Sequence, residues 1–293
     1  MLLLSLFSPK RRSVFLVDHV ELAHYCPRYN RMLNLYKVAL GPILLMQARW
    51  LRRTALRLPE ASGPRSGIET GRDCVTEPLR ILVVGDSSAA GVGVTNQAEA
   101  LAQPVAKLLA SMTGRSVAWQ LVARSGVNTS EALELLAHSD LDAADYLVTA
   151  LGTNDVTSQR NSIQFLRDYV LLVDTLRRRT GALGLVVTGL PPLRILPAAP
   201  HPLRWYLGRC AIRLDRALRD WTERDRMARY VSLEWAARPE DMAQDGFHPG
   251  PAQYRHWAGL VAEQIHALLA STARNEANHR STPASTASDG LAV

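Results

Sequence analysis

Short apolar segments alternate with stretches of helical periodicity through most of this 293-residue chain. The apolar segments are rich in valine, leucine and isoleucine, which is typical of strands buried on both faces of a sheet. They span residues 80–85, 116–123, 145–151, 183–189 and 229–235. The helical stretches span residues 95–112, 129–138, 163–179, 209–226 and 251–269. Five such strand–helix units predict an α/β fold of three layers, α/β/α, with a five-stranded parallel sheet in the middle.

The regular pattern defines one domain, which we expect over residues 78–270. The segment before it, residues 1–77, is expected to be an extension with a short helix and a linker, because "PEASGPRSG" (59–67) is rich in turn-forming residues. Residues 271–293 are rich in serine, threonine and alanine and carry few large apolar side chains, so a disordered tail is expected.

The positive charge of the chain lies in the extension. The net charge is +7, and residues 1–80 hold 13 basic and 6 acidic side chains, whereas residues 81–293 hold 21 of each. A nucleic-acid-binding domain usually has its own basic excess, so the charge distribution argues against nucleic acid as a partner.

The extension also contains a short apolar run, "VALGPILLM" (38–46), followed by Arg49, Arg52, Arg53 and Arg57. This run has about half of the roughly 20 residues that a membrane-spanning helix needs. An apolar helix with a basic flank can lie on an anionic membrane surface, so residues 38–57 are a candidate peripheral membrane contact. A helix packed on the domain with its arginines in solvent explains the pattern equally well.

The first residues do not have the order of a secretory signal. In "MLLLSLFSPKRR" the apolar residues precede the basic ones, and Met32 is an alternative start. The three cysteines, Cys26, Cys74 and Cys210, are widely spaced, which favours free thiols over a disulfide framework or a zinc site. Together these features predict a cytoplasmic protein, with contact at the inner membrane face as the alternative.

In a parallel sheet, ligands bind beyond the carboxyl ends of the strands. "GDSS" (85–88) follows the first predicted strand, and its Ser87 is a candidate nucleophile. A serine needs a base and a group that orients the base. Of the eight histidines, only His248 has an acid in a suggestive position, because Asp245 precedes it by three residues in the loop after the fifth strand. Taken alone, Asp245 is also explained as the cap of a turn.

A serine nucleophile further needs hydrogen-bond donors for an oxyanion, which are usually a large electrostatic contribution. Asn154, in "GTND" just after the third strand, offers a side-chain amide. Gly126, after the second strand, offers a backbone N–H without a Cβ to block approach. Ser87 itself opens a predicted helical turn, where its N–H and the helix dipole would point the same way.

Three other interpretations fit less of the sequence. Glycines at a helix start can bind phosphate, but no lysine of a Walker motif is nearby, and Gly91 and Gly93 come too late for a dinucleotide fingerprint. A receiver-like signalling module with Asp86 as acceptor leaves Asp245 and His248 unexplained. An inactive scaffold does not explain why all of the candidate motifs are intact.

The motifs together resemble the SGNH hydrolase superfamily, also called the GDSL esterases and lipases. "GDSSAAGVG" resembles the first block of the family and Gly126 the second. Gly152, Asn154 and Asp155 match the third, and Asp245 with His248 matches the Asp-x-x-His block. The resemblance covers about residues 78–269. Ser88 stands where the name-giving motif has leucine, and the G-x-S-x-G elbow of ordinary α/β-hydrolases is absent.

The resemblance implies a flavodoxin-like SGNH hydrolase fold and a serine esterase that works without metal or cofactor. It implies that Ser87, His248 and Asp245 act as nucleophile, base and orienting acid. It further implies Ser87, Gly126 and Asn154 as oxyanion donors and Asp86, Gly152 and Asp155 as supporting residues.

The substrate class is predicted more broadly. A small-molecule or lipid ester with a short or medium acyl chain, or an aryl ester, is expected, and a carbohydrate O-acetyl group is the alternative. Residues 190–208 carry many apolar side chains after the fourth strand, so they form either a flap over the acyl site or a hydrophobic patch that caps a helix.

Overall fold

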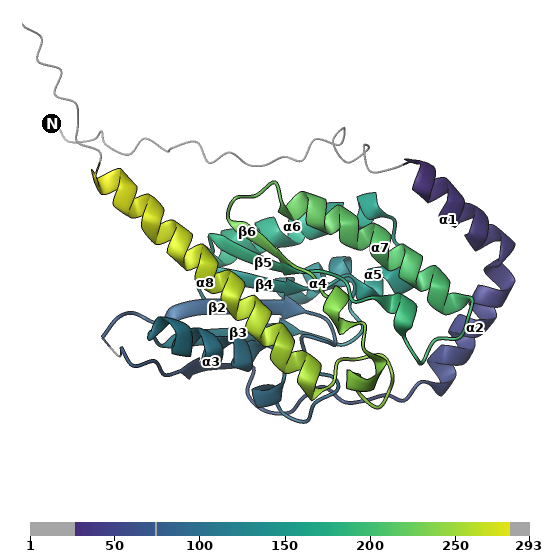
Figure 1. Ribbon diagram of the computed structural model, residues 1–293, viewed down its shortest axis with the longest axis horizontal. Coiled ribbons are helices and arrows are strands. Elements are labelled where there is room, and N and C mark those ends of the chain that lie inside the picture. The colour runs from purple at the N-terminus through teal and green to yellow at the C-terminus, as the bar shows by residue number, and fades with distance from the viewer. Residues whose placement is uncertain (1–26, 74, 282–293) are drawn as a thin grey trace, which may run out of the picture.

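The computed structural model describes residues 27–73 and 75–281 (Figure 1). Its centre is a six-stranded sheet with strand order β1-β3-β2-β4-β5-β6. The strands are β1 Ser66–Glu69, β2 Leu79–Gly85, β3 Val117–Ala123, β4 Tyr146–Ala150, β5 Gly184–Thr188 and β6 Ala228–Val231. Strands β2 to β6 pair in parallel, and β1 pairs antiparallel with β3 at the edge. The predicted five-stranded parallel sheet is confirmed, with one edge strand added.

The added strand overlaps the end of the segment predicted to be a linker, residues 59–67, so that prediction is wrong where β1 begins, at residues 66 and 67. The backbone of β1 pairs with β3 over four residues, and Ala61 is buried just before it. The side chains of β1 are mostly exposed. An edge strand that buries no apolar face lacks the hydrophobic pattern by which strands are found in a sequence. Residues before 78 therefore belong to the packed structure: β1 pairs with β3, and Leu33 and Leu44 are part of the hydrophobic core.

Helices cover both faces of the sheet, which confirms the predicted three-layer arrangement (Figure 1). Side chains alternate along β2: Ile81 and Val83 pack toward one face, Leu82 and Val84 toward the other. The first face is covered by α3 Ala102–Thr113 and α8 Pro251–Ser281, and the second by α4 Thr129–Ala137, α6 Ser162–Thr180 and α7 Leu203–Thr222. Short α5 Thr153–Thr157 follows β4, while α1 Pro27–Ala39 and α2 Gly41–Thr54 pack on α7.

Three helix boundaries differ most from the prediction. Helix α3 begins at Ala102, after the predicted residue 95, because turns and a short 3-10 helix precede it. Helix α7 begins at Leu203, before the predicted residue 209, so the insert after β5 is shorter than expected. Helix α8 continues to Ser281, so residues 271–281 are helical where a disordered tail was predicted. The remainder of the predicted tail, like Cys26 and Cys74, lies outside the described residues.

Two further features bear on the extension and the thiols. In the part of the chain that the structure describes, no helix has the length and apolar character needed to cross a bilayer. Cys210 is a free thiol buried in α7.

Candidate active site

The turn after β2 carries Ser87 at the carboxyl edge of the sheet. Gly85 ends the strand where a Cβ would lie 2.4 Å from the Cβ of Ala89, so only glycine allows the chain to fold back this tightly. The Asp86 carboxylate accepts a hydrogen bond from the Ser88 N–H at 3.0 Å and stabilises the turn. The chain then forms successive turns rather than a helix, and the first regular helix, α3, begins only at Ala102. The predicted helix dipole at Ser87 is therefore absent.

A continuous hydrogen-bond chain joins Ser87 to two residues of the loop before α8. The Ser87 Oγ lies 2.9 Å from His248 Nε2, and His248 Nδ1 lies 2.5 Å from Asp245 Oδ2. The other Asp245 oxygen accepts the backbone N–H groups of Phe247 and His248, each at 3.0 Å. Burial raises the pKa of Asp245, but these hydrogen bonds outweigh it and lower the pKa below its ordinary value. Asp245 is therefore ionised at neutral pH and holds the imidazole in one orientation.

The candidate oxyanion donors lie around the same turn. Gly126 has a φ of +84° in the exposed loop after β3, a conformation that favours glycine. Asn154, at the start of α5, donates its side-chain amide to the Val127 carbonyl at 3.0 Å and contacts Asp86 Oδ2 at 3.4 Å. The amide thus bridges the turn after β2 and the loop after β3. Burial raises the pKa of Asp86 to about 6, although the Ser88 N–H and His248 act against this.

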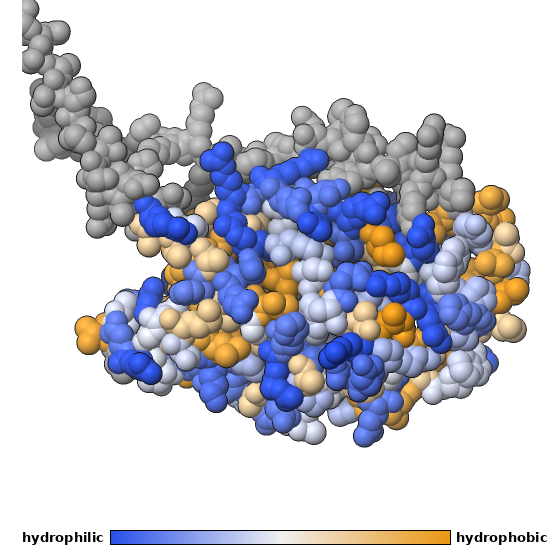
Figure 2. All heavy atoms as spheres, viewed as in Figure 1, coloured by the Kyte–Doolittle hydropathy of each residue, from blue (hydrophilic) through white to orange (hydrophobic). Residues whose placement is uncertain are grey.

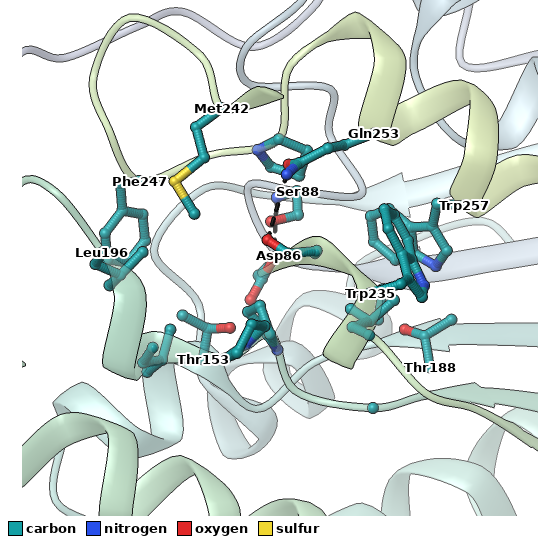
Figure 3. A pocket seen from close by; sticks show the side chains of 18 of the residues that line it. Asp86, Ser88, Thr153, Thr188, Leu196, Trp235, Met242, Phe247, Gln253 and Trp257 are labelled. Atoms are coloured by element: carbon teal, nitrogen blue, oxygen red, sulfur yellow. Dashed lines mark hydrogen bonds between the residues drawn. The ribbon is translucent and has the colours of Figure 1, made fainter. Parts of the chain in front are cut away.

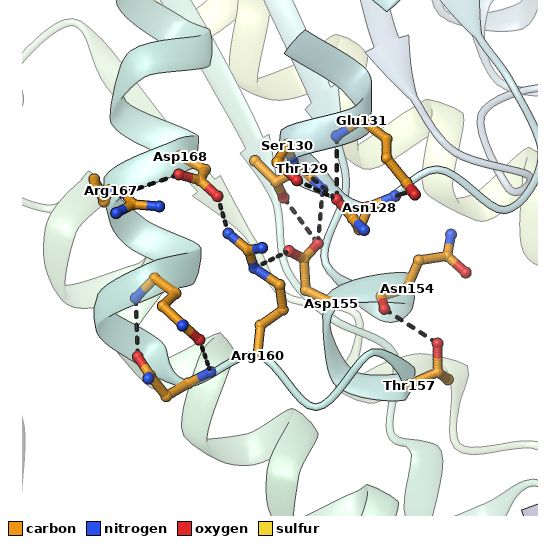
Figure 4. Close-up of polar contacts among 12 residues, drawn as sticks. Asn128, Thr129, Ser130, Glu131, Asn154, Asp155, Thr157, Arg160, Arg167 and Asp168 are labelled. Atoms are coloured by element: carbon orange, nitrogen blue, oxygen red, sulfur yellow. Dashed lines mark hydrogen bonds and ion pairs between the residues drawn. The ribbon is translucent and has the colours of Figure 1, made fainter. Parts of the chain in front are cut away.

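Gly152 and Asp155 support this arrangement, and Figure 4 shows the polar contacts of Asp155. Gly152 has a φ of +130°, and a Cβ there would lie 2.8 Å from Leu190. The fully buried Asp155 accepts two hydrogen bonds from Thr129, from its N–H at 3.0 Å and from its hydroxyl at 2.8 Å. Its other oxygen faces Arg160 Nε at 3.7 Å. Asp155 therefore links the start of α4 to α5, and its side chain points away from that of Asn154.

A mainly apolar pocket, partly open to solvent, lies beside the Ser87 turn. In Figure 3, Asp86 and Ser88 form one wall, Trp235 and Trp257 lie to one side, and Leu196 and Phe247 lie to the other. The insert after β5 contributes Leu193 and Leu196 to this lining. Other apolar side chains of the predicted flap, Leu203, Tyr206 and Leu207, are buried in the core and do not line the pocket.

Comparison with known proteins identifies the family of the domain that carries this site. The model of the GDSL-like lipase/acylhydrolase family matches residues 83–256, which is more than half of the chain. The chain belongs to the GDSL-like lipase/acylhydrolase family. Membership makes it a carboxylic ester hydrolase. A search of curated proteins found no match.

The solved structure of TesA shows that this GDSL-like hydrolase has the family fold, and two other structures are similar to it. TesA is 22% identical with a TM-score of 0.50, and the match covers 64% of this chain and 99% of TesA. The lipase Lip_vut3 from a goat rumen metagenome is 17% identical over 65% of this chain and 97% of its own, with a TM-score of 0.49. A carbohydrate esterase family 2 enzyme from Corynascus thermopiles is 17% identical over 73% and 69%, with a TM-score of 0.48.

Two contacts at the site of this GDSL-like hydrolase were not anticipated from the sequence. The hydroxyl of Tyr254, on α8, lies 2.8 Å from the carbonyl oxygens of both Ser88 and Val92 and holds the turn after β2. Tyr254 is part of "GPAQY", directly after the Asp-x-x-His block, but a tyrosine near the start of a helix is by itself uninformative.

The second contact is an ion-pair clamp from the segment predicted to be a linker. Glu60 Oε1 accepts the Ser125 N–H at 2.7 Å, and Arg65 Nη1 donates to the Ala123 carbonyl at 2.6 Å. Glu60 and Arg65 also pair with each other. Through these contacts the ion-pair clamp holds the backbone of residues 123 and 125, directly before Gly126, in place. A Glu and an Arg five residues apart in a turn-rich segment give no such signal in the sequence.

Proposed function

We propose that this hydrolase is a serine esterase that cleaves carboxylic esters through an acyl-enzyme formed on Ser87. The observation that carries the proposal is the hydrogen-bond chain from Ser87 Oγ through His248 to the ionised Asp245. A serine, a histidine and a carboxylate in this order are the parts of a nucleophile, a general base and its orienting group.

In the first half of the reaction, Ser87 Oγ forms a bond to the ester carbonyl carbon while His248 Nε2 accepts the hydroxyl proton. His248 then gives this proton to the leaving alkoxide as the ester C–O bond breaks. In the second half, His248 accepts a proton from water, whose oxygen bonds to the acyl carbon. The Ser87 Oγ–acyl bond then breaks, Ser87 is reprotonated by His248, and the carboxylic acid leaves.

The developing oxyanion is assigned to the N–H groups of Ser87 and Gly126 and to the Asn154 amide. The hydrogen bond of Asn154 to Val127 holds the amide in place, whereas its 3.4 Å contact with Asp86 is long for a hydrogen bond. We infer that the oxyanion replaces this second, weaker contact. A donor that strengthens its bond only in the transition state raises kcat rather than substrate affinity.

The pocket beside Ser87 supports an acyl chain as the group bound there. Most of its lining residues are apolar, among them four leucines and two tryptophans, so it favours an apolar group over a sugar. We therefore infer esters with short or medium acyl chains as substrates. A panel of esters of increasing acyl length, measured beside acetylated glycans, tests this: an activity confined to the acetylated glycans would contradict the acyl assignment.

The nucleophile is tested by covalent labelling and by Ser87→Ala. A fluorophosphonate probe is expected to label the wild-type protein, and Ser87→Ala is expected to abolish labelling and to reduce kcat by several orders of magnitude. Ser88→Ala is the matched control, because it removes the neighbouring hydroxyl and leaves the Ser88 N–H in place. Retention of more than about a tenth of the activity in Ser87→Ala would assign the nucleophile elsewhere.

A further inference from the structure

Helices α1 and α2 form an elbow that is seated on α7 by its inner side. Leu33 of α1 and Leu44 of α2 are buried on this inner side. The side-chain amide of Gln47 donates to the His201 carbonyl at 2.6 Å and accepts the Leu203 N–H at 3.0 Å. The elbow therefore has a defined orientation, and its outer side faces solvent.

The outer side of this elbow is apolar to a degree unusual for a solvent-facing surface. Val38 is 78% exposed, Met46 63% and Trp50 54%. Leu35, Ile43 and Leu45 are also exposed. Figure 2 shows apolar side chains grouped at the right-hand edge, where Figure 1 places the α1–α2 elbow. We call this group of six residues the elbow surface. A contiguous exposed apolar group that is surrounded by polar residues commonly marks an interaction site, whereas single exposed apolar residues do not.

The charge around the elbow surface has one sign. Residues 27–59 contain seven basic side chains and no acidic one. Arg49, Arg52, Arg53 and Arg57 are exposed, and within the described residues none of them forms an ion pair. Because residues 81–293 have equal numbers of basic and acidic side chains, the positive field is local to the extension.

We propose that the elbow surface binds an anionic lipid bilayer, lying in its interface without crossing it. The exposed apolar side chains enter the boundary between headgroups and acyl chains, while the arginines pair with lipid phosphates. This combination selects the partner: a nucleic acid provides phosphates but nothing to cover Leu35, Val38 and Met46. Helix α2 has 14 residues, too few for the roughly 20 that span a bilayer.

The contact of Gln47 with residues 201 and 203 gives this surface a consequence for substrate access. The insert that ends at these residues also supplies Leu193 and Leu196 to the pocket beside Ser87. A bilayer bound at the elbow surface therefore contacts α2, the helix that is hydrogen-bonded to the end of the pocket-lining insert. The lipid binding itself does not depend on the proposed triad.

Sedimentation of the full-length protein with vesicles tests the proposal. Binding is expected to vesicles that contain phosphatidylglycerol, to be much weaker to pure phosphatidylcholine, and to fall as salt is added. The combined Arg49→Gln, Arg52→Gln and Arg53→Gln variant is expected to bind about 100-fold more weakly, because each basic residue near an anionic surface contributes about a factor of five. Met46→Ser with Trp50→Ser is expected to weaken binding at high and low salt alike.

The control removes the same charge elsewhere, with Arg72→Gln, Lys107→Gln and Arg226→Gln combined, all three at exposed positions. It is expected to bind within several-fold of wild type, and hydrolysis of a soluble aryl ester by the elbow variants is expected to be unchanged. Absence of binding to phosphatidylglycerol vesicles at low salt overturns the proposal, as does equal loss in the control. A wild-type dimer in solution that Trp50→Ser converts to monomer assigns the elbow surface to a second copy of the chain instead.

Discussion

Removal of the Glu60 carboxylate should slow catalysis although Glu60 does not touch the Ser87–His248 pair. Glu60 accepts the Ser125 N–H at 2.7 Å, one residue before Gly126. A hydrogen bond to a charged acceptor contributes about 1.5–3 kcal/mol. The ion pair of Glu60 with Arg65 adds at most about 1 kcal/mol, because the Glu60 side chain is 29% exposed and the Arg65 side chain 41%. Because Ser125 is exposed, water replaces part of the lost bond, so the lower end of this range applies.

Glu60→Ala removes about 1.5 kcal/mol of the free energy that holds this loop in position. If all of it is lost from the transition state, kcat is expected to fall about tenfold. The ceiling is the 100- to 1000-fold effect of losing one oxyanion donor outright. Glu60→Gln keeps an oxygen that accepts from Ser125, so its kcat is expected to remain within about threefold of wild type. KM is expected to change little in both variants, since the donor acts mainly on the transition state.

The assay is initial-rate hydrolysis of a soluble aryl ester, with thermal unfolding measured in parallel. Burial raises the pKa of Glu60, but the hydrogen bonds of Ser125 and Arg65 lower it below its ordinary value. The clamp is therefore complete above the ordinary pKa and is lost only as the pH falls through the lowered one, so neutral pH is suitable. Glu77→Ala, an exposed acid outside the loop, is the control. A lower Tm for Glu60→Ala with unchanged kcat would show that the clamp only stabilises the fold.

Three further predictions concern the turn, the amide and the buried acid. Asn154→Ala is expected to lower kcat by about 100- to 1000-fold with little change in KM, and an effect confined to KM would contradict an oxyanion role. Gly93→Ala is expected to impair hydrolysis, because its Cβ would lie 2.2 Å from the Pro249 carbonyl and displace the loop of His248; activity equal to wild type would refute this. Burial raises the pKa of Asp155 to about 6, against the hydrogen bonds of Thr129, so folded protein binds this proton more tightly and stability declines as the pH rises from 4 through 6. Asp155→Asn is expected to remove that decline, which amounts to about 3 kcal/mol of stability. Curves of Tm against pH that run parallel for wild type and Asp155→Asn would contradict this role of Asp155.

The alternation of apolar and helical segments was enough to predict the parallel sheet and its three layers. Strands buried on both faces, such as β2 with Ile81 to Val84, must be apolar throughout, so the constraint is written into consecutive residues. The same holds for local motifs. Asp245 and His248 lie in one loop, so their spacing along the chain already brings the carboxylate to the imidazole.

Only the tertiary structure decided which distant residues meet at this edge of the sheet. Ser87 and His248 are 161 residues apart, and they come together because α8 packs against α3 and β5 and its Tyr254 holds the turn after β2. Strand β1 and the Glu60 clamp were missed because an edge strand with exposed side chains needs no apolar pattern; its backbone partner on β3 supplies what holds it. Sequence periodicity records burial, whereas backbone pairing and long-range hydrogen bonds depend on where the rest of the chain has folded.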